Sequence, residues 1–316
     1  MRLHVVTTEF PPFFGGVGTW AGAVAAALAG ADHEVHVWAH HGAPIAGVTF
    51  HRLWGRSWNR WGGVWVAAQV RPWLADDDVV VCTTWPLATH LGPRRSLCVA
   101  WHGSDLTRPA VVAGRERVAA QADNLVVSNY LGERLGAPST WMPYPIEPVE
   151  AAPRGEALLT IARLVQSKGV DRVLRLGARL GRPVVVVGDG PERPALERLA
   201  VELGVGARFC GATRDIPWAG TWALALFSRP YPDGSGAEGL GLVLLEAAAR
   251  GLPTLGTRVG GIPEAAHVIL DDPDTDDVPA LPDAAEVHAR LAARHGTAHF
   301  LAAFSAARTA GPAARR

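Results

Sequence analysis

The chain has 316 residues, which suits two domains, and 48% of them are hydrophobic, which is enough for two packed cores. Thirty Lys and Arg residues balance 30 Asp and Glu residues, so no overall basic charge is present to attract nucleic acid or an anionic membrane. Cys82, Cys98 and Cys210 are too widely spaced for a zinc or redox motif. No stretch resembles a signal peptide or a transmembrane segment, so we expect a cytoplasmic protein with small or local partners.

Short aliphatic runs alternate with longer amphipathic stretches, which is typical of parallel strands joined by helices. In the first half we expect strands at residues 3–9, 34–40, 79–84, 96–102 and 124–129. In the second half we expect them at residues 157–163, 183–189, 207–211, 224–228 and 253–257. Between the halves, residues 137–156 are rich in proline and lack helical periodicity, so we interpret them as an interdomain linker.

This pattern predicts an α/β protein with two doubly wound, Rossmann-like domains that face each other across a cleft. We place the first domain at residues 1–145 and the second at residues 146–316. From Asp283 onward the composition predicts a helical tail, which we include in the second domain. Ligands of such domains bind at the carboxyl ends of the strands, so the loops there are the candidate functional segments.

Three of these loops carry residues suited to an anion. Gly15 and Gly16 would let the backbone approach a ligand just before a helix begins, although an ordinary glycine-rich turn fits equally well. Residues 188–193, GDGPER, lack the third glycine of a dinucleotide fingerprint, which disfavours a nicotinamide site. Arg163 and Lys168 stand five residues apart at a strand exit, where two cations suit a diphosphate; in isolation, such a pair is more often a solvated surface feature.

Two acids occur in an otherwise apolar stretch at residues 237–257. Glu238 precedes a helix that we expect to begin near Gly239, and Glu246 follows about two turns later. Carboxylates at such a place can accept hydrogen bonds from sugar hydroxyls. A helix cap with one exposed acid is the alternative, and it explains the glycines poorly. The amides at the helix start would face the same ligand: Gly239, Leu240 and Gly241.

Taken in order, these motifs resemble retaining glycosyltransferases of family 4, whose fold is GT-B. Glu238 and Glu246 reproduce the family's E-x7-E spacing. The segments PPFFGGVGTW, WHGSD, ARLVQSKGVD, VVGDGPE and EGLGLVLLEAAARGLPTLGTRVGGIPE follow in family order. The resemblance covers nearly the whole chain, and the ordered set is far more specific than any single segment.

The resemblance implies a role for each matching residue. Arg163 and Lys168 would clamp the diphosphate of a nucleoside-diphosphate sugar, Glu246 would bind the ribose and Glu238 the donor sugar. His102 would lie beside the transferring sugar. The second domain would bind the donor and the first domain the acceptor. Backbone amides of Gly239, Leu240 and Gly241 would contact the phosphates, and Gly15 with Gly16 would line the cleft.

The family resemblance also implies chemistry without a metal ion or other cofactor. The acidic runs at residues 76–78 and 271–277 are therefore interpreted as solvated loops. Four tryptophans in the first domain recur at spacings of four, three and four, which on a helix would form one aromatic face: Trp54, Trp58, Trp61 and Trp65. Such a face stacks on sugar rings or packs in a core, and the second is the commoner use.

We therefore expect an enzyme that moves a hexose-type sugar to an acceptor hydroxyl with retention of configuration. The acceptor would be a small molecule or lipid-linked. A departing diphosphate oxygen would take the acceptor proton, so His102 would not serve as the base; alternatively, His102 only closes its turn by bonding Asp105. Two other functions stay open: a nucleotide-sugar epimerase or related non-transferase enzyme on the same scaffold, and a binding-only partner subunit.

Overall fold

The computed structural model describes residues 1–13, 15–55, 62–91, 96–103, 106, 112–231 and 236–309. The chain divides into two compact units. Unit 1 comprises Met1–Pro145 together with His295–Arg316, and unit 2 comprises Ile146–Arg294. Among the described residues, none of the helices combines the length and the apolar composition that crossing a bilayer requires.

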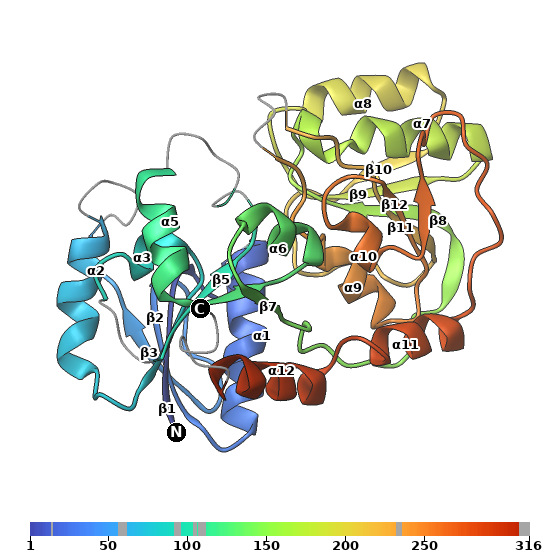
Figure 1. Cartoon of the computed structure of the whole chain (residues 1–316). Coiled ribbons are helices and arrows are strands. Elements are labelled where there is room, and N and C mark those ends of the chain that lie inside the picture. The colour runs from blue at the N-terminus through green and yellow to red at the C-terminus, as the bar shows by residue number, and fades with distance from the viewer. Residues whose placement is uncertain are drawn as a thin grey trace. The chain divides into compact units, whose positions relative to one another are not determined.

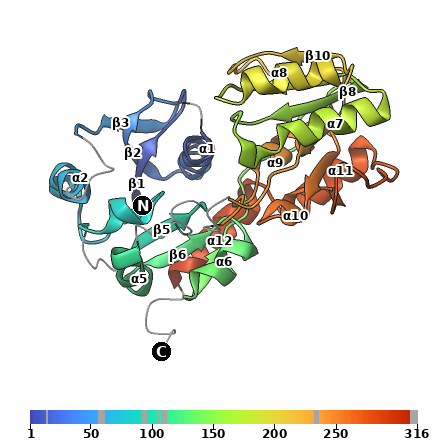
Figure 2. The ribbon, with the colours of Figure 1, turned by 90° about the horizontal axis from the view of Figure 1, so that it is seen from above.

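Unit 1 is built on a seven-stranded parallel sheet with the order β3-β2-β1-β4-β5-β6-β7. The strands are β1 (Arg2–Glu9), β2 (Glu34–His41), β3 (Val48–Arg52), β4 (Val79–Cys82), β5 (Leu97–Trp101), β6 (Asp123–Val126) and β7 (Ser139–Trp141). The helices are α1 (Gly16–Gly30), α2 (Gly62–Val70), η1 (Arg71–Trp73), α3 (Trp85–Ala88), α5 (Val112–Gln121), α6 (Asn129–Leu135) and α12 (Thr297–Thr309). Helices α1 and α12 cover one face of the sheet, and α2 and α5 cover the other (Figures 1 and 2).

Unit 2 has a six-stranded parallel sheet with the order β10-β9-β8-β11-β12-β13. The strands are β8 (Arg154–Ile161), β9 (Val184–Val187), β10 (Ala207–Phe209), β11 (Thr221–Leu226), β12 (Thr254–Thr257) and β13 (Val268–Leu270). The helices are η3 (Gln166–Lys168), α7 (Val170–Leu180), α8 (Arg193–Glu202), α9 (Leu242–Ala248), α10 (Ile262–Ala265) and α11 (Ala284–Ala292). Figures 1 and 2 show α7 and α8 on one face and α9 and α10 on the other.

The α/β fold expected from the sequence is confirmed, but three strands lie outside the expected set: β3, β7 and β13. All three are edge strands. An edge strand has one neighbour and partial cover, so β3 and β7 mix polar and apolar side chains, whereas β13 is aliphatic but only three residues long, too short to stand out as a run. The all-valine strand β9 and the fully buried β4 and β5 show the opposite pattern, and they were expected.

Residues 137–156 are not one linker, as the sequence suggested. The stretch begins with β7 in unit 1 and ends with the first residues of β8 in unit 2, and the two units meet in the chain between Pro145 and Ile146. The prolines of this stretch all lie outside β7 and β8, where the backbone N–H is not needed for a strand ladder.

The C-terminal tail also differs from the expectation. The expected helical tail forms two helices in its described part, Ala284–Ala292 and Thr297–Thr309, and Asp283 caps the first of them, α11, with a capping box to Glu286. The next helix, α12, belongs to unit 1, because its Phe300 and Phe304 are buried there against α1, β6 and β7. We had assigned this tail to the second domain.

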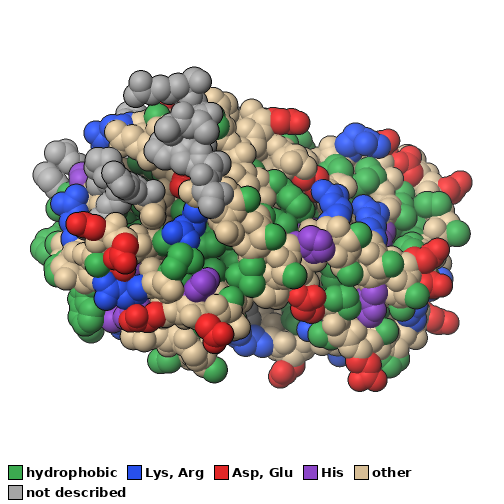
Figure 3. Space-filling view, turned by 60° about the horizontal axis from the view of Figure 1, so that its bottom comes forward, with side chains coloured by type: hydrophobic (Ala, Val, Ile, Leu, Met, Phe, Trp, Pro, Cys, Tyr) green, Lys and Arg blue, Asp and Glu red, His purple; other side chains and the backbone are tan. Residues whose placement is uncertain are grey.

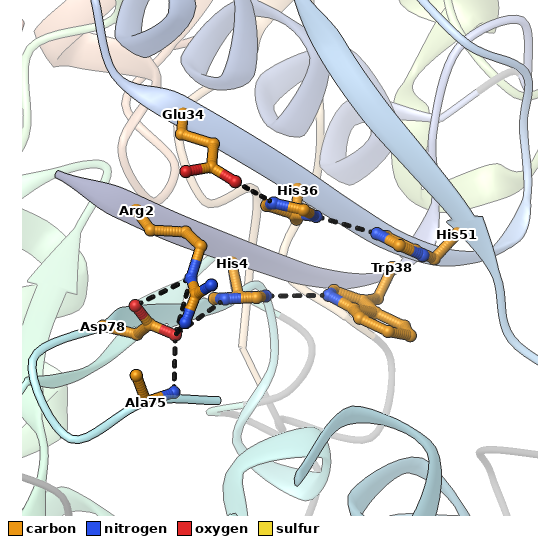
Figure 4. A network of polar contacts seen from close by, with 8 residues as sticks. All are labelled: Arg2, His4, Glu34, His36, Trp38, His51, Ala75 and Asp78. Atoms are coloured by element: carbon orange, nitrogen blue, oxygen red, sulfur yellow. Dashed lines mark hydrogen bonds and ion pairs between the residues drawn. The ribbon is translucent and has the colours of Figure 1, made fainter. Parts of the chain in front are cut away.

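A network of polar contacts joins the first strands of unit 1 (Figure 4). The buried carboxylate of Asp78 accepts hydrogen bonds from the Arg2 guanidinium at 2.8 and 3.0 Å and from the Ala75 N–H at 2.7 Å. His4 Nδ1 accepts the indole N–H of Trp38 at 3.1 Å, so its proton lies on Nε2 and is donated to Asp78 at 3.2 Å. Burial lowers the pKa of His4 to about 4, although Asp78 opposes that shift.

The same network continues along β2 and β3. His36 bridges Glu34, at 2.9 Å from its Nε2, and His51, at 2.8 Å from its Nδ1 (Figure 4). These groups lie on one face of the sheet and start at the amino ends of β1 and β2. Parallel sheets bind ligands at the carboxyl ends of their strands, so this network lies away from the expected ligand site. Basic and acidic side chains are interspersed on the face drawn in Figure 3, in keeping with the zero formal net charge.

Candidate active site

The candidate donor site of unit 2 lies where the strand order reverses. Strands β8 and β11 are neighbours, but the chain proceeds from β8 toward β9 on one side and from β11 toward β12 on the other. Open α/β sheets bind ligands at such a switch point, outside the carboxyl ends of the strands. Arg163 is the second residue after β8, and Glu238 lies between β11 and α9.

The loop that carries Arg163 is held by the glycines of the GDGPE motif. A methyl carbon at Gly188 would lie 1.9 Å from the carbonyl oxygen of Ala162, and one at Gly190 would lie 2.4 Å from that of Leu164. Backbone hydrogen bonds flank Arg163 on both sides. Arg163 itself is exposed, and its side chain forms no ion pair or hydrogen bond with the described residues. The glycines of the motif thus fix the backbone on both sides of Arg163, whose guanidinium remains available to a ligand.

Lys168 and Glu238, which the sequence placed in one site, form an ion pair. The two side chains retain 23% and 17% of their exposure, so the pair is shielded but still within reach of a ligand. Burial by itself lowers the pKa of the Lys168 ammonium, but the charge and hydrogen bond of Glu238 outweigh it, and the pKa is raised. Lys168 is therefore a cation, and the charge of nearby Arg163 also acts on it.

A second ion pair fixes the loop that presents Lys168. The guanidinium of Arg229 donates two hydrogen bonds of 2.7 Å to the two carboxylate oxygens of Asp171 in α7. The backbone N–H of Arg229 also bonds the carbonyl of Ser167 at 2.8 Å. These bonds tie the segment after β11 to η3, which ends at Lys168. The position of Lys168, and with it the ion pair to Glu238, is thus held by the contacts of Arg229 with Asp171 and with Ser167.

Glu238 is positioned through its backbone. Its carbonyl accepts the N–H of Gly261 at 2.9 Å, and the preceding Gly260 has a φ of 61°. A methyl carbon at Gly260 would lie 2.1 Å from the Glu238 carbonyl oxygen. Only glycine combines this conformation with so close an approach. The loop after β12 therefore sets where Glu238 lies.

Helix α9 begins at Leu242 and not near Gly239 as expected from the sequence. Gly241 adopts a left-handed φ of 82° and precedes the helix, so Gly239 and Leu240 lie outside it. Glu246 consequently lies about one turn into α9. Burial raises the pKa of its carboxyl group, and the charge of Arg250 opposes that shift in part.

In unit 1, His102 directly follows β5. Its ring meets the buried indole of Trp20 edge-on, with centroids 4.8 Å apart, and burial lowers the pKa of its imidazole to about 3. The ring is therefore neutral at physiological pH. The alternative partner Asp105 lies outside the described residues, so the suggested closure of the turn stays a prediction.

Gly15 and Gly16 lie at the start of α1, after β1. A methyl carbon at Gly15 would lie 2.0 Å from Oε2 of Glu9, the last residue of β1. That oxygen is buried and accepts no hydrogen bond from the described residues, and burial raises the pKa of the Glu9 carboxyl group. Glu9 is a candidate site residue that we did not identify from the sequence. Its position between an apolar strand and a glycine loop was the available signal.

The aromatic stripe does not form a core at the two positions that the structure describes. Trp54 and Trp65 are 73% and 60% exposed, whereas Trp58 and Trp61 lie outside the described residues. Residues 271–277 form a loop closed by its own hydrogen bonds and by an ion pair from Arg258 to Asp271. Among the described residues, no three His, Cys, Asp or Glu side chains gather as a metal site.

Two parallel α/β units, with the ion pair of Lys168 and Glu238 near the switch point of the second, have the GT-B fold that solved glycosyltransferases share. Residues 155–286, all within unit 2, match the family described as Glycosyl transferases group 1. The chain therefore carries a group 1 glycosyl transferase domain. The predicted GT-B fold and the predicted resemblance to family 4 enzymes are confirmed.

The comparisons with individual proteins agree with this assignment. The crystal structure of AviGT4, a glycosyltransferase involved in avilamycin A biosynthesis, matches with a TM-score of 0.75 and 18% identity, over 98% of this chain and 97% of that one. A GDP-mannose-dependent alpha-(1-6)-phosphatidylinositol monomannoside mannosyltransferase of Mycolicibacterium smegmatis is 28% identical over 264 residues, 67% of this chain and 68% of that protein. The protein of the same name from Mycobacterium tuberculosis is 29% identical over 323 residues, 84% of this chain and 83% of that protein. These relatives do not favour an epimerase.

Proposed function

We propose that this glycosyltransferase moves mannose from GDP-mannose to a hydroxyl group of a lipid-linked or small-molecule acceptor, with retention of configuration and without a metal ion. The donor proposal draws on the relatives, two of which are named as GDP-mannose-dependent mannosyltransferases of a phosphatidylinositol mannoside. The mechanism draws on the charges at the switch point of unit 2.

The ion pair of Lys168 with Glu238, beside the unpaired Arg163, is the observation that carries the proposal. A leaving nucleoside diphosphate gains negative charge as the sugar bond breaks. Fixed cations that face the phosphates stabilise that charge, and the guanidinium of Arg163 can donate two parallel hydrogen bonds to them. Two protein cations thus do the work that a divalent ion does in other enzymes.

The ion pair also suggests how the donor changes the site. A diphosphate oxygen that approaches Lys168 competes with Glu238 for the ammonium, and the released carboxylate can accept hydrogen bonds from the sugar hydroxyls. We assign Glu246 to the ribose hydroxyls, because its desolvated carboxylate gains most from neutral donors. The amides of Gly239, Leu240 and Gly241 are assigned to the phosphates.

The neutral imidazole of His102 favours a retaining mechanism. A group with a pKa of about 3 is a poor base at neutral pH, so His102 is unsuited to deprotonating the acceptor hydroxyl. An oxygen of the departing diphosphate can take that proton if the acceptor attacks from the same face of the sugar. Retention follows, and an α-linked donor yields an α-glycoside. We assign His102 to steadying the sugar as positive charge develops on it.

The test is to incubate the full chain with GDP-mannose, UDP-glucose or dTDP-glucose and to measure released nucleoside diphosphate. Each donor is tested alone, with phosphatidylinositol monomannoside and with a small soluble sugar. We expect release from GDP-mannose that depends on the acceptor, and an α-linked product by NMR. Release only from another nucleotide would overturn the donor assignment, and a β-linked product from the α-linked donor would overturn retention.

The metal proposal has its own control in the same assay. Turnover should persist in excess EDTA, because Arg163 and Lys168 supply the positive charge that the diphosphate needs. Loss of turnover in EDTA that magnesium or manganese restores would contradict metal independence.

A further inference from the structure

One surface of unit 1 exposes large apolar side chains outside the candidate active site. Trp54, Trp65 and Trp73 are 73%, 60% and 54% exposed, and Val64 is 41% exposed. We call these four residues the indole surface. Helix α2, which contributes Val64 and Trp65, contains no charged residue and lies at the outer edge of unit 1 in both views (Figures 1 and 2). Trp54 and Trp65 are neighbours, because the backbone of each bonds the side chain of Gln69, and exposed apolar side chains that lie together mark interaction sites.

The backbone beneath the indole surface is fixed. The side chain of Gln69 accepts the N–H of Trp54 at 2.9 Å and donates to the carbonyls of Trp54 and Trp65 at 3.1 and 3.0 Å. A methyl carbon at Gly63 would lie 2.8 Å from the carbonyl oxygen of Pro86, so the opposite side of α2 packs closely on the segment around α3. These contacts hold α2 in its orientation. A rotation that buried Trp54 and Trp65 would break them.

Trp73 is fixed from beneath by other rings. Its centroid lies 5.0 Å from that of His51 and 5.8 Å from that of Trp38, two residues of the polar network in Figure 4. One side of this indole is thus packed on the sheet while more than half of the side chain faces outward. A partner that covers the indole surface meets side chains whose backbone is already ordered, which lowers the entropic cost of binding.

The size and chemistry of the surface distinguish between its potential partners. A tryptophan buries about 150–250 Å² when it is covered completely, so the three indoles within the described part of this surface, which are partly covered already, offer less than the roughly 800 Å² per partner of a stable protein interface. Indoles are instead favoured in the headgroup region of a bilayer, where an apolar ring meets a polar N–H. Arg52 and Arg71, both exposed, stand two residues before Trp54 and Trp73 in the chain and can contact lipid phosphates.

We propose that the indole surface docks unit 1 onto the headgroup region of a phospholipid membrane. The chain then lies on the bilayer, with α2 parallel to its surface. Burial of indoles drives the association, since a formal net charge of zero gives little long-range attraction. The proposal goes beyond the proposed function, because it requires neither GDP-mannose nor a lipid-linked acceptor.

The test is co-sedimentation of the full chain with vesicles of phosphatidylcholine, with and without phosphatidylglycerol. We expect binding to both, and a few-fold tighter binding to the anionic vesicles because of Arg52 and Arg71. The double variant Trp54→Ser, Trp65→Ser should lose about tenfold or more in vesicle affinity. Val201→Ser is the matched control, because Val201 is 81% exposed on α8 of unit 2.

The variants keep the proposal falsifiable. Trp54 and Trp65 are exposed, so their replacement should leave the melting temperature and GDP affinity close to those of the wild type. Failure of the wild-type chain to bind either vesicle, or equal binding by the double variant, would overturn the proposal. Concentration-dependent dimerisation that only the double variant loses would assign the surface to a second copy and also overturn it. GDP binding by calorimetry tests the proposed function separately.

Discussion

The Gly260→Ala variant tests whether the loop after β12 positions Glu238. Gly260 has a φ of 61°, and a methyl group there would meet the carbonyl oxygen of Glu238. Gly181→Ala is the matched control, because Gly181 has a φ of 62° in the same unit and nothing within 4 Å of the added methyl carbon. Both variants place alanine in the left-handed region, and only one of them collides with the site.

The two effects separate in magnitude. Left-handed backbone costs a non-glycine residue about 1–2 kcal/mol, and both variants share that loss of stability. At position 260 the carbon–oxygen distance must also grow from 2.1 Å to at least 3.0 Å, a shift of about 0.9 Å. A displacement of about 1 Å in a residue that positions the substrate costs roughly 100-fold in rate. We therefore expect kcat/KM of Gly260→Ala to fall about 100-fold below that of Gly181→Ala.

The assay is mannose transfer from GDP-mannose, with thermal unfolding and GDP calorimetry on the same samples. GDP affinity should change by no more than a few-fold, because Arg163 lies on a different loop. Equal kcat/KM values for the two variants would refute the positioning of Glu238 by Gly260. A rate lost together with all GDP binding would also refute it, since the disturbance would then extend to the whole donor site.

Four further predictions concern charges. Lys168→Met and Glu238→Gln should each cost about 1–3 kcal/mol of stability by leaving a shielded charge unpaired, and the double variant should cost clearly less than their sum; additive losses in denaturant titrations would contradict the ion pair. Arg163→Ala should lower kcat/KM by about two to three decades at unchanged melting temperature, and wild-type turnover would remove Arg163 from the clamp. His102→Ala should lower turnover by about two decades with GDP affinity within a few-fold, and an unimpaired variant would make His102 structural. Because His4 has a pKa of about 4 when folded and 6.5 ordinarily, it takes up a proton on unfolding, so the free energy of unfolding should fall as the pH is lowered from 6.5 toward 4; a flat profile measured in denaturant at each pH would contradict this.

The sequence predicted the central strands because burial on both faces leaves a continuous apolar run, as in β4 and β9. Of the four edge strands it predicted β10 but not β3 and β7, whose mixed side chains resemble loops, nor β13, which has only three residues. The sequence also did not show that α12 packs in unit 1. Phe300 of α12 is buried there, next to elements from the first half of the chain, and such long-range contacts leave no local pattern. A helical pattern shows that one face must be covered but not which sheet covers it.

The charged residues of the candidate donor site were proposed from motif order, and the structure brings Arg163, Lys168 and Glu238 together. Their pairing was not predicted, since spacing along the chain does not show which of two acids meets a given lysine. Glu9 was missed for a related reason. An acid after a strand looks like any solvated loop residue until its burial is known.

Close contacts of backbone with backbone help to hold the loops of the candidate donor site. Glycines after three different strands leave room for a carbonyl oxygen where a methyl group would collide: Gly169 against Phe227, Gly188 against Ala162, and Gly260 against Glu238. These contacts fix the loops that present the cations and the carboxylate, so the loop positions are set by the backbone as well as by the ion pair of Lys168 and Glu238. The glycines that look like a weak dinucleotide fingerprint have this purpose. This role of the glycines is not visible in the sequence. Each glycine makes room for the backbone of another loop of the same unit, and that loop is distant along the chain.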